Sequence, residues 1–154
     1  MNERSVTHAT FVVDRTYDAS PGRVFAAFSD PVAKARWFSC HDDSVFAEFD
    51  FRVGGRERHQ GGPPGGPSYT VDCRYEDIVV GQRIVYTYAM YLGEQRISVS
   101  LVTVELVPTG TGTRLSFTEQ GAYLDGHDVA GREHGTGEGL DRLGELLQRE
   151  PAHA

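Results

Sequence analysis

Cysteine is scarce in this sequence, which contains only Cys40 and Cys73. The two lie far apart, form no CxxC pair and have no second pair to complete a thiolate zinc site, so metal binding through sulfur is not expected. No HExxH or comparable spacing of metal ligands occurs either, and we expect neither a metal nor another cofactor. Cys73 falls on the apolar phase of a strand pattern, which predicts a thiol packed in the core.

Positive charge and long apolar runs are also limited. Lys34 is the only lysine, and the net charge of −7 argues against a nucleic-acid partner, because phosphate binding needs a clustered excess of Lys and Arg. No run approaches the roughly 20 apolar residues that a membrane helix requires. The polar first residues, MNERSVTHATF, do not resemble a signal peptide. We therefore expect a cytoplasmic protein with no membrane span and no nucleic-acid partner.

The sequence does contain enough apolar material for one folded unit. Hydrophobic residues make up 39% of the 154 residues and charged residues 24%, as in ordinary globular proteins. A chain of this length buries about 70% of its unfolded surface when it folds around one core. No internal repeat divides it, so residues 1–154 are predicted to form a single domain.

Alternating apolar residues predict about seven strands. They are expected over residues 7–17, 45–49, 51–58, 68–80, 83–92, 96–108 and 114–124. Two short helices follow the first strand: Ser20 and Pro21 form a helix start signal, and Asp30 and Pro31 repeat it. The longest helical window spans about 128–149. Its second half has an apolar face, whereas its first half, GREHGTGEG, is so rich in glycine that we expect a frayed or kinked start.

The order of these elements determines the architecture. Strands joined by short turns must be mainly antiparallel, and a meander with one apolar face needs a cover, which only the C-terminal helix is long enough to supply. The predicted fold class is α+β: a helix-grip fold, in which a curved antiparallel sheet of six or seven strands wraps around the long C-terminal helix. Because a curved sheet and a helix cannot meet evenly, a ligand site is expected in the space between them.

A resemblance to a known family rests on five segments in order: SPGRVFAAFSDPVAKARWF, FRVGGRER, YEDIVVGQRIVYTY, GTRLSFTEQG and GLDRLGELL. This order resembles the SRPBCC superfamily, which groups START lipid-transfer, polyketide cyclase and plant-allergen-like helix-grip proteins. The branch it resembles most is the bacterial homologues of the C-terminal domain of the heat-shock ATPase activator. Relatives often carry a Gly-Trp pair entering the last helix, where this chain has Gly139-Leu140. The resemblance implies a cavity between sheet and helix.

Aromatic residues from several elements are the main candidates for lining that cavity. Together with the family's cavity they predict a mostly apolar pocket for a small hydrophobic ligand, in which tyrosine hydroxyls orient the ligand. Packing in the core is the alternative for each of them. The predicted cavity residues are Trp37, Phe38, Phe46, Phe51, Arg56, Tyr75, Tyr86, Tyr88, Val99, Leu101, Phe117, Glu119, Tyr123 and Leu140.

Arg56 is included because charged residues alternate along its short strand. Arg56 and Arg58 alternate with Glu57 and His59, so one of these two pairs would point into the cavity. In the family that the chain resembles, the cavity sometimes holds an arginine that binds an acidic group of the ligand. The alternative is that Arg56 lies in solvent on a short hairpin, where its ion pairs would contribute little.

Glu119 and two histidines are the candidates for catalysis. Glu119 continues the inward phase of Leu115 and Phe117, and His127 and His134 follow in the next loop and helix start. A carboxylate beside an imidazole could remove a proton next to a carbonyl, as a cyclase does. The alternative is a set of solvated groups around a glycine-rich helix start.

The stretch GGRERHQGGPPGGPSYT, residues 54–70, is unusually rich in glycine and proline. It lacks a GK[ST] sequence and precedes a strand, so it is not a phosphate-binding loop. We interpret Gly54-Gly55 as a bulge that bends one strand. Residues 61–67 are predicted to form a wide hairpin loop that acts as a flap over the cavity mouth.

Three functions are consistent with these patterns. The preferred one is non-catalytic binding of a small hydrophobic molecule, aromatic or lipid-like. The second is an enzyme of the polyketide cyclase or aromatase type that uses Glu119, a histidine and the cavity tyrosines. The third is a protein-interaction module like the chaperone-ATPase activator, which would need an exposed apolar patch. Two copies could also pair through strand edges as a homodimer, which the sequence leaves undecided.

Overall fold

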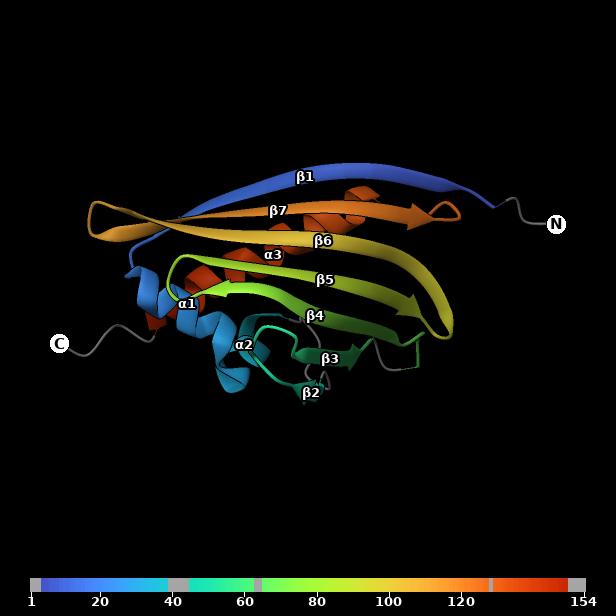
Figure 1. Cartoon of the computed structure of the whole chain (residues 1–154), viewed down its shortest axis with the longest axis horizontal. Helices are drawn as coiled ribbons and strands as arrows, with labels where there is room; N and C mark the ends of the chain where they lie inside the picture. The colour runs from blue at the N-terminus through green and yellow to red at the C-terminus, as the bar shows by residue number, and fades with distance from the viewer. Residues whose placement is uncertain (1–3, 39–44, 63–64, 128, 150–154) are drawn as a thin grey trace.

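The computed structural model describes residues 4–38, 45–62, 65–127 and 129–149, which form one sheet and three helices (Figure 1). The strands form a single antiparallel sheet in the order β1-β7-β6-β5-β4-β3-β2. The predicted α+β helix-grip fold is confirmed. The strands are β1 (Val6–Tyr17), β2 (Val45–Phe49), β3 (Arg56–Gly61), β4 (Tyr69–Val79), β5 (Arg83–Leu92), β6 (Gln95–Thr109) and β7 (Gly112–Leu124).

The two short helices, α1 (Pro21–Ser29) and α2 (Pro31–Phe38), begin where the sequence predicts. The Ser20 hydroxyl accepts a hydrogen bond from the backbone N–H of Arg23 at 3.2 Å, which caps α1. Asp30 plays the same part for α2, because its Oδ1 accepts from the backbone N–H of Val32 at 3.0 Å. Both helices have proline at their first position, where its missing N–H has no partner to lose.

The long helix α3 (Val129–Arg149) lies behind the sheet in the view of Figure 1. Leu140, Leu143, Leu146 and Leu147 are buried on one of its faces, and full burial of each contributes about 1.5–3 kcal/mol. Leu140, the second residue of the Gly139-Leu140 pair, is 1% exposed. The predicted frayed or kinked start is wrong: the helix runs without interruption through its glycine-rich first half. No helix in the described ranges is both long and apolar enough to cross a bilayer.

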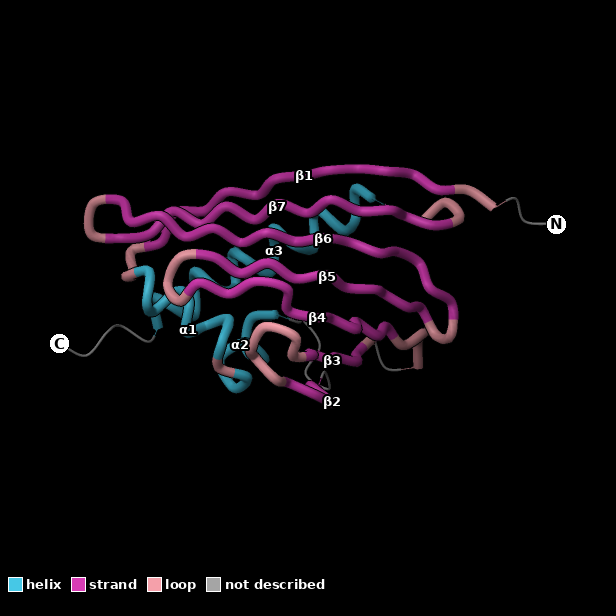
Figure 2. The backbone as a smooth tube through the Cα atoms, in the orientation of Figure 1, coloured by secondary structure: helices cyan, strands magenta, loops and turns pink. Residues whose placement is uncertain are grey.

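Gly54 and Gly55 close the turn between β2 and β3, so the predicted bulge within one strand is wrong. Gly54 has a φ of 84°, and a Cβ on Gly55 would lie 2.1 Å from the carbonyl oxygen of Asp50. The sheet is bent instead by register shifts elsewhere, including one between Met90 and Tyr91 on β5. Figure 2 shows that β5 and β6 run side by side to the turn that joins them.

The proline pair of the glycine-rich loop, residues 63 and 64, lies outside the described residues. The prediction that residues 61–67 form a flap over the cavity mouth therefore stays a prediction. Cys40 also lies outside the described residues. Cys73 is a free thiol that is 2% exposed within β4, and burial raises its pKa far above the ordinary value.

Candidate functional site

A cavity of about 570 Å³ lies between the sheet and α3. One group of lining residues is apolar or aromatic and comes from α1, α2, β4, β5, β6, β7 and α3: Phe28, Trp37, Phe38, Val71, Tyr86, Tyr88, Met90, Ile97, Phe117 and Leu140. A second group is polar or charged: Lys34, Glu57, His59, Glu119, His127, Arg132, Thr136, Glu138 and Arg142. A pocket of this size and lining is typical of small-molecule sites.

Glycines on α3 help to keep the cavity open. Gly131, Gly135 and Gly139 are four residues apart, so they share one helix face, and all three line the cavity. A Cβ placed on Gly135 would meet no other atom within 4 Å. The glycine-rich first half of α3 therefore leaves room that larger side chains would fill.

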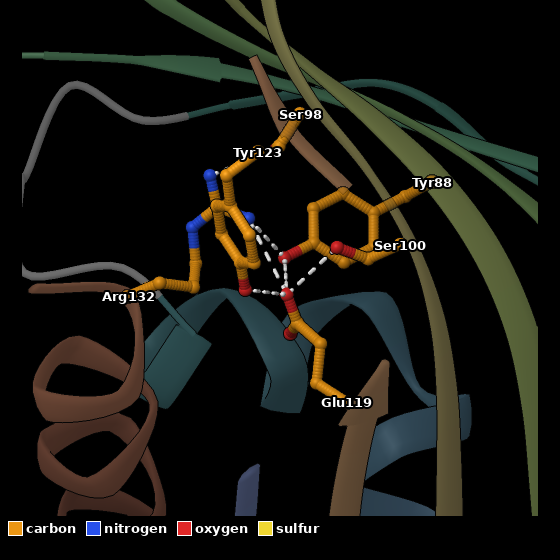
Figure 3. A network of polar contacts seen from close by, with 6 residues as sticks. All are labelled: Tyr88, Ser98, Ser100, Glu119, Tyr123 and Arg132. Carbon is orange, nitrogen blue, oxygen red and sulfur yellow. Dashed lines mark hydrogen bonds and ion pairs between the residues drawn. The ribbon is translucent and has the colours of Figure 1, made fainter. Parts of the chain in front are cut away.

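The carboxylate of Glu119 is the centre of one polar cluster in the cavity, drawn in Figure 3. Its Oε2 accepts hydrogen bonds from the hydroxyls of Tyr88 at 2.7 Å, Ser100 at 2.9 Å and Tyr123 at 3.2 Å. Arg132 reaches the same oxygen from α3, with Nη1 at 3.3 Å. Glu119 is 1% exposed, so the guanidinium and the three hydroxyls replace the water that a buried carboxylate loses.

Arg132 ties the first turn of α3 to the sheet. Besides Glu119, it donates to the Tyr88 hydroxyl through Nη1 at 2.8 Å and to Ser98 through Nη2 at 2.9 Å. Burial alone would lower its pKa, but the facing Tyr88 and Glu119 outweigh that effect and raise it. The arginine is therefore a permanent cation. Sequence reasoning did not single it out, because it lies in a segment with poor helix propensity.

Burial keeps the tyrosines in and behind the cavity wall protonated. It is the main reason that the pKa of Tyr88 and that of Tyr86 lie far above the ordinary value of tyrosine, and it raises the pKa of Tyr123 to about 12. The nearby charge of Glu119 adds to the effect on Tyr123. All three phenols therefore keep their proton through the neutral range, and those of Tyr88 and Tyr123 donate it to Glu119.

Ser98 and Ser100 occupy inward positions on β6, which explains why two predicted cavity residues of the same strand lie outside the cavity. Val99 and Leu101 are 44% and 37% exposed, so their predicted place in the cavity is wrong. At the Met90–Tyr91 register shift, Ile97 and Ser98 are both buried, and the inward phase of β6 then continues through Ser100. The apolar pattern pointed to the wrong phase because two inward positions carry hydroxyls.

A second polar cluster lies where α2 meets β3 and β4. The ammonium of Lys34 is 2.6 Å from Oε1 of Glu57, and the Tyr75 hydroxyl donates to the same oxygen. The side chains of Lys34 and Glu57 are 3% and 2% exposed. Lys34 also lies 4.8 Å above the ring centre of Phe38, a cation–π contact. The sequence showed that Lys34 is unique but gave no sign of its place.

Arg56 is outside the cavity. Its side chain is 54% exposed and binds Asp72 at 2.8 Å, so the prediction that it lines the cavity is wrong. The alternation on β3 is real, but Glu57 and His59 occupy the inward phase. Burial lowers the pKa of His59, whose ring packs against those of Phe38 and Phe46.

The other predicted residues fall into two groups. Seven line the cavity: Trp37, Phe38, Tyr86, Tyr88, Phe117, Glu119 and Leu140. Four pack behind its walls: Phe46 against His59, Phe51 against Tyr75, and Tyr75 and Tyr123 against the two carboxylates.

The two candidate histidines are not bonded to Glu119. His127 lines the cavity, whereas His134 is 77% exposed and its Nε2 lies 2.6 Å from Glu138. The groups in contact with Glu119 are thus a guanidinium and hydroxyls. Over the described residues, no three His, Cys, Asp or Glu side chains are placed to hold a metal ion.

A curved antiparallel sheet that grips a C-terminal helix across a lined cavity defines a helix-grip protein of the SRPBCC class. The family model of the "Activator of Hsp90 ATPase homolog 1-like protein" matches residues 18–148. The chain belongs to this family, and the resemblance drawn from the sequence is confirmed. Proteins of the wider superfamily often bind hydrophobic ligands.

Solved structures agree with this assignment. A protein from Rhizobium loti is 51% identical, with a TM-score of 0.87 over 93% of this chain and 99% of that one. A protein from Rhizobium leguminosarum is 44% identical, with a TM-score of 0.88 over 96% and 99%. A protein of the dynemicin biosynthetic locus shares the fold at 18% identity, with a TM-score of 0.69 over 90% of this chain and 47% of that one. No match was found among curated proteins.

Proposed function

We propose that the protein binds a small hydrophobic molecule, aromatic or lipid-like, in the cavity between the sheet and α3. The observation that carries this proposal is the cavity of about 570 Å³, whose walls combine aromatic side chains with a few fixed polar groups. Trp37, Tyr86 and Phe117 offer apolar surface from three separate elements, while Glu119 and Arg132 offer hydrogen bonds. Such a division between apolar walls and few polar groups favours ligands that are mostly apolar.

Two measurements test the proposal. Native mass spectrometry of freshly purified protein should reveal a co-purifying molecule, and a thermal-shift screen of aromatic and acyl compounds should find binders. A ligand at a hundred times its Kd adds about 2.7 kcal/mol to the free energy of unfolding, which for a domain of this size raises Tm by about 5–10 °C. If no compound of a broad hydrophobic panel raises Tm, the proposal fails.

A cyclase-type enzyme is the second candidate, favoured by the position of Glu119 on the cavity wall beside Arg132 and Tyr88. In this version the carboxylate accepts a proton from a carbon next to a ketone of the bound substrate, and the guanidinium stabilises the charge that forms. The test is turnover of a linear aromatic polyketide analogue, followed by mass spectrometry and repeated with Glu119→Gln. Tight binding without turnover would exclude this candidate for that substrate class.

We also propose that residues 1–154 act as one domain in the cytoplasm. The outer strands β1 and β2 are the edges through which two copies could pair. Light scattering on the eluting protein separates monomer from homodimer. Pull-down with a chaperone ATPase tests the third function, that of a protein-interaction module, and the absence of any binding at micromolar concentrations would exclude it.

A further inference from the structure

Two carboxylates in the cavity each use only one oxygen to bind the protein. All the hydrogen bonds that Glu119 receives end on Oε2, and its other oxygen points away from the donors in Figure 3. On Glu57, Lys34 and Tyr75 both bind Oε1. Among the described residues, Oε1 of Glu119 and Oε2 of Glu57 have no hydrogen-bond partner.

These two oxygens face the cavity. In the described part of the chain, no side-chain oxygen or nitrogen that is fully closed off lacks a partner, so both atoms must retain some open surface. Glu57 and Glu119 are each 1% exposed and both line the cavity, so that surface belongs to it. Each oxygen is a charged acceptor that only water or a ligand can satisfy, and leaving it without a donor is costly.

The Tyr86 hydroxyl is a third open group, and its ring packs beside those of Tyr75 and Tyr88. Its ring centre is 6.0 Å from that of Tyr75 and 6.1 Å from that of Tyr88, the phenols that donate to Glu57 and Glu119. No described residue forms a hydrogen bond with its hydroxyl, and the residue lines the cavity. Tyr86 is thus a polar group on the cavity wall whose ring neighbours the tyrosines bound to both carboxylates.

The separation of the carboxylates sets the length of a ligand that reaches both. Glu57 is on β3 and Glu119 on β7, four strands apart in the sheet. Neighbouring strands are about 4.8 Å apart, so the two backbones are roughly 19 Å apart along the sheet. Both side chains extend into the same cavity, which shortens the gap. A ligand that reaches both carboxylates must therefore extend across several strands of the sheet.

The charges around the two open oxygens disfavour an acidic ligand group at either of them. Lys34 is already paired with Glu57 at 2.6 Å and Arg132 with Glu119 at 3.3 Å, so neither cation is left for an acid. An acidic group beside either open oxygen would meet a like charge. Arg142, which donates Nε to the carbonyl oxygen of Trp37, is a partly buried cation on the cavity wall that keeps further donors.

We propose that the ligand is an extended, neutral aromatic molecule with a hydroxyl donor at each end, one for Glu119 and one for Glu57. This inference rests on the proposed function, since it assumes that the ligand occupies the cavity. A hydrogen bond to a charged acceptor in a buried site changes affinity by about tenfold to a hundredfold. Each terminal hydroxyl should therefore contribute at least a tenfold increase in affinity.

A matched set of stilbenes tests this on the wild-type protein by calorimetric titration. The set contains trans-stilbene, its 4-hydroxy, 4,4′-dihydroxy and 4,4′-dimethoxy derivatives, and stilbene-4-carboxylate. We expect the dihydroxy compound to bind about tenfold more tightly than the monohydroxy one, which in turn binds about tenfold more tightly than stilbene. The dimethoxy compound, which only accepts hydrogen bonds, should bind no better than stilbene.

The outcomes separate this inference from the function on which it rests. If stilbene binds as tightly as the dihydroxy compound, the cavity binds hydrophobic ligands but the two-donor inference is overturned. If the carboxylate binds most tightly, the inference is also overturned and Arg142 becomes the anchor. If neither these compounds nor the broad hydrophobic panel bind, the proposed function fails and the inference with it.

Glu119→Gln adds a second test with the same ligands. The amide oxygen can still accept from Arg132 and the hydroxyls, which turns an N–H donor toward the cavity in place of the open oxygen. The variant should bind the dihydroxy compound about tenfold less tightly than the wild type does. The ratio of the affinities for the dihydroxy and dimethoxy compounds should therefore be smaller in the variant. Glu105→Gln, on the exposed face of β6, is the matched control and should change nothing. If folded Glu119→Gln prefers the dihydroxy over the dimethoxy compound as strongly as the wild type does, the inference is overturned. If the variant does not fold, the titrations of the stilbenes into the wild-type protein decide.

Discussion

Replacing Gly135 by alanine should make the protein more stable, although glycine stands there in the natural sequence. The residue lies in the interior of α3, and a Cβ at this position meets no atom within 4 Å. Alanine is about 0.8–1 kcal/mol more favourable than glycine in a helix interior. The free energy of unfolding should therefore rise by about 0.5–1 kcal/mol, and Tm by about 1–4 °C. Urea and thermal denaturation measure both quantities.

A larger side chain at the same position should reduce ligand binding. Gly135 lines the cavity, so the side chain in Gly135→Leu extends into the space that the ligand needs. We expect the affinity for a ligand found by native mass spectrometry to fall at least tenfold, while the protein stays at least as stable as the wild type. Loss of binding with gain of stability would identify this glycine as a functional residue.

Gly137→Ala is the matched control on the same helix. Its Cβ would point away from the cavity toward Arg15, 3.2 Å from Nη2 at the end of a flexible side chain. This variant should gain a similar stability from helix propensity and keep its ligand affinity. The reasoning is refuted if Gly135→Ala is less stable than the wild type, because the space would then be filled. Unchanged affinity in Gly135→Leu would show that the ligand does not lie against α3.

Three further predictions concern stability. Leu143→Ala removes a fully buried side chain of α3 and should lower the free energy of unfolding by about 2–5 kcal/mol in urea denaturation. Lys34→Met leaves Glu57 as an unpaired buried charge and should cost about 3–5 kcal/mol; adding Glu57→Leu should recover part of that loss, and no recovery would contradict the ion-pair argument. Burial lowers the pKa of His59 below its ordinary value of 6.5, so the unfolded chain binds its proton more readily. The stability that neutral His59 provides is full above pH 6.5 and is lost as pH falls through the folded pKa. His59→Gln should lose less stability than the wild type between pH 7 and pH 5, measured by urea denaturation.

The fold was largely predictable because local signals agreed with one another. Two proline starts placed α1 and α2, and short turns between alternating strands required an antiparallel meander. The errors came where the physical cause is non-local. A register shift near Met90 decides which side of β6 faces inward, and inward Ser98 and Ser100 carry no apolar signal.

Only part of the candidate site could be predicted, because some of its residues follow a local sequence pattern and others meet only in the folded protein. Glu119 followed from strand alternation, since its neighbours Leu115 and Phe117 define the phase. Arg132 did not, because its partner is thirteen residues away on a different element and only the docking of α3 brings them together. Lys34 and Glu57 likewise meet only when α2 packs beside β3.

The single lysine has one more consequence, for chemistry at amines. Lys34 is the only residue of the chain with an ε-amino group, and its side chain is 3% exposed beneath α2. A lysine-directed acylating reagent can therefore modify it only when α2 moves away from the sheet. The rate of acylation at this position would measure how often that opening occurs. Each modified molecule would be left with a buried carboxylate that has lost its cation, which favours the open state over the closed one.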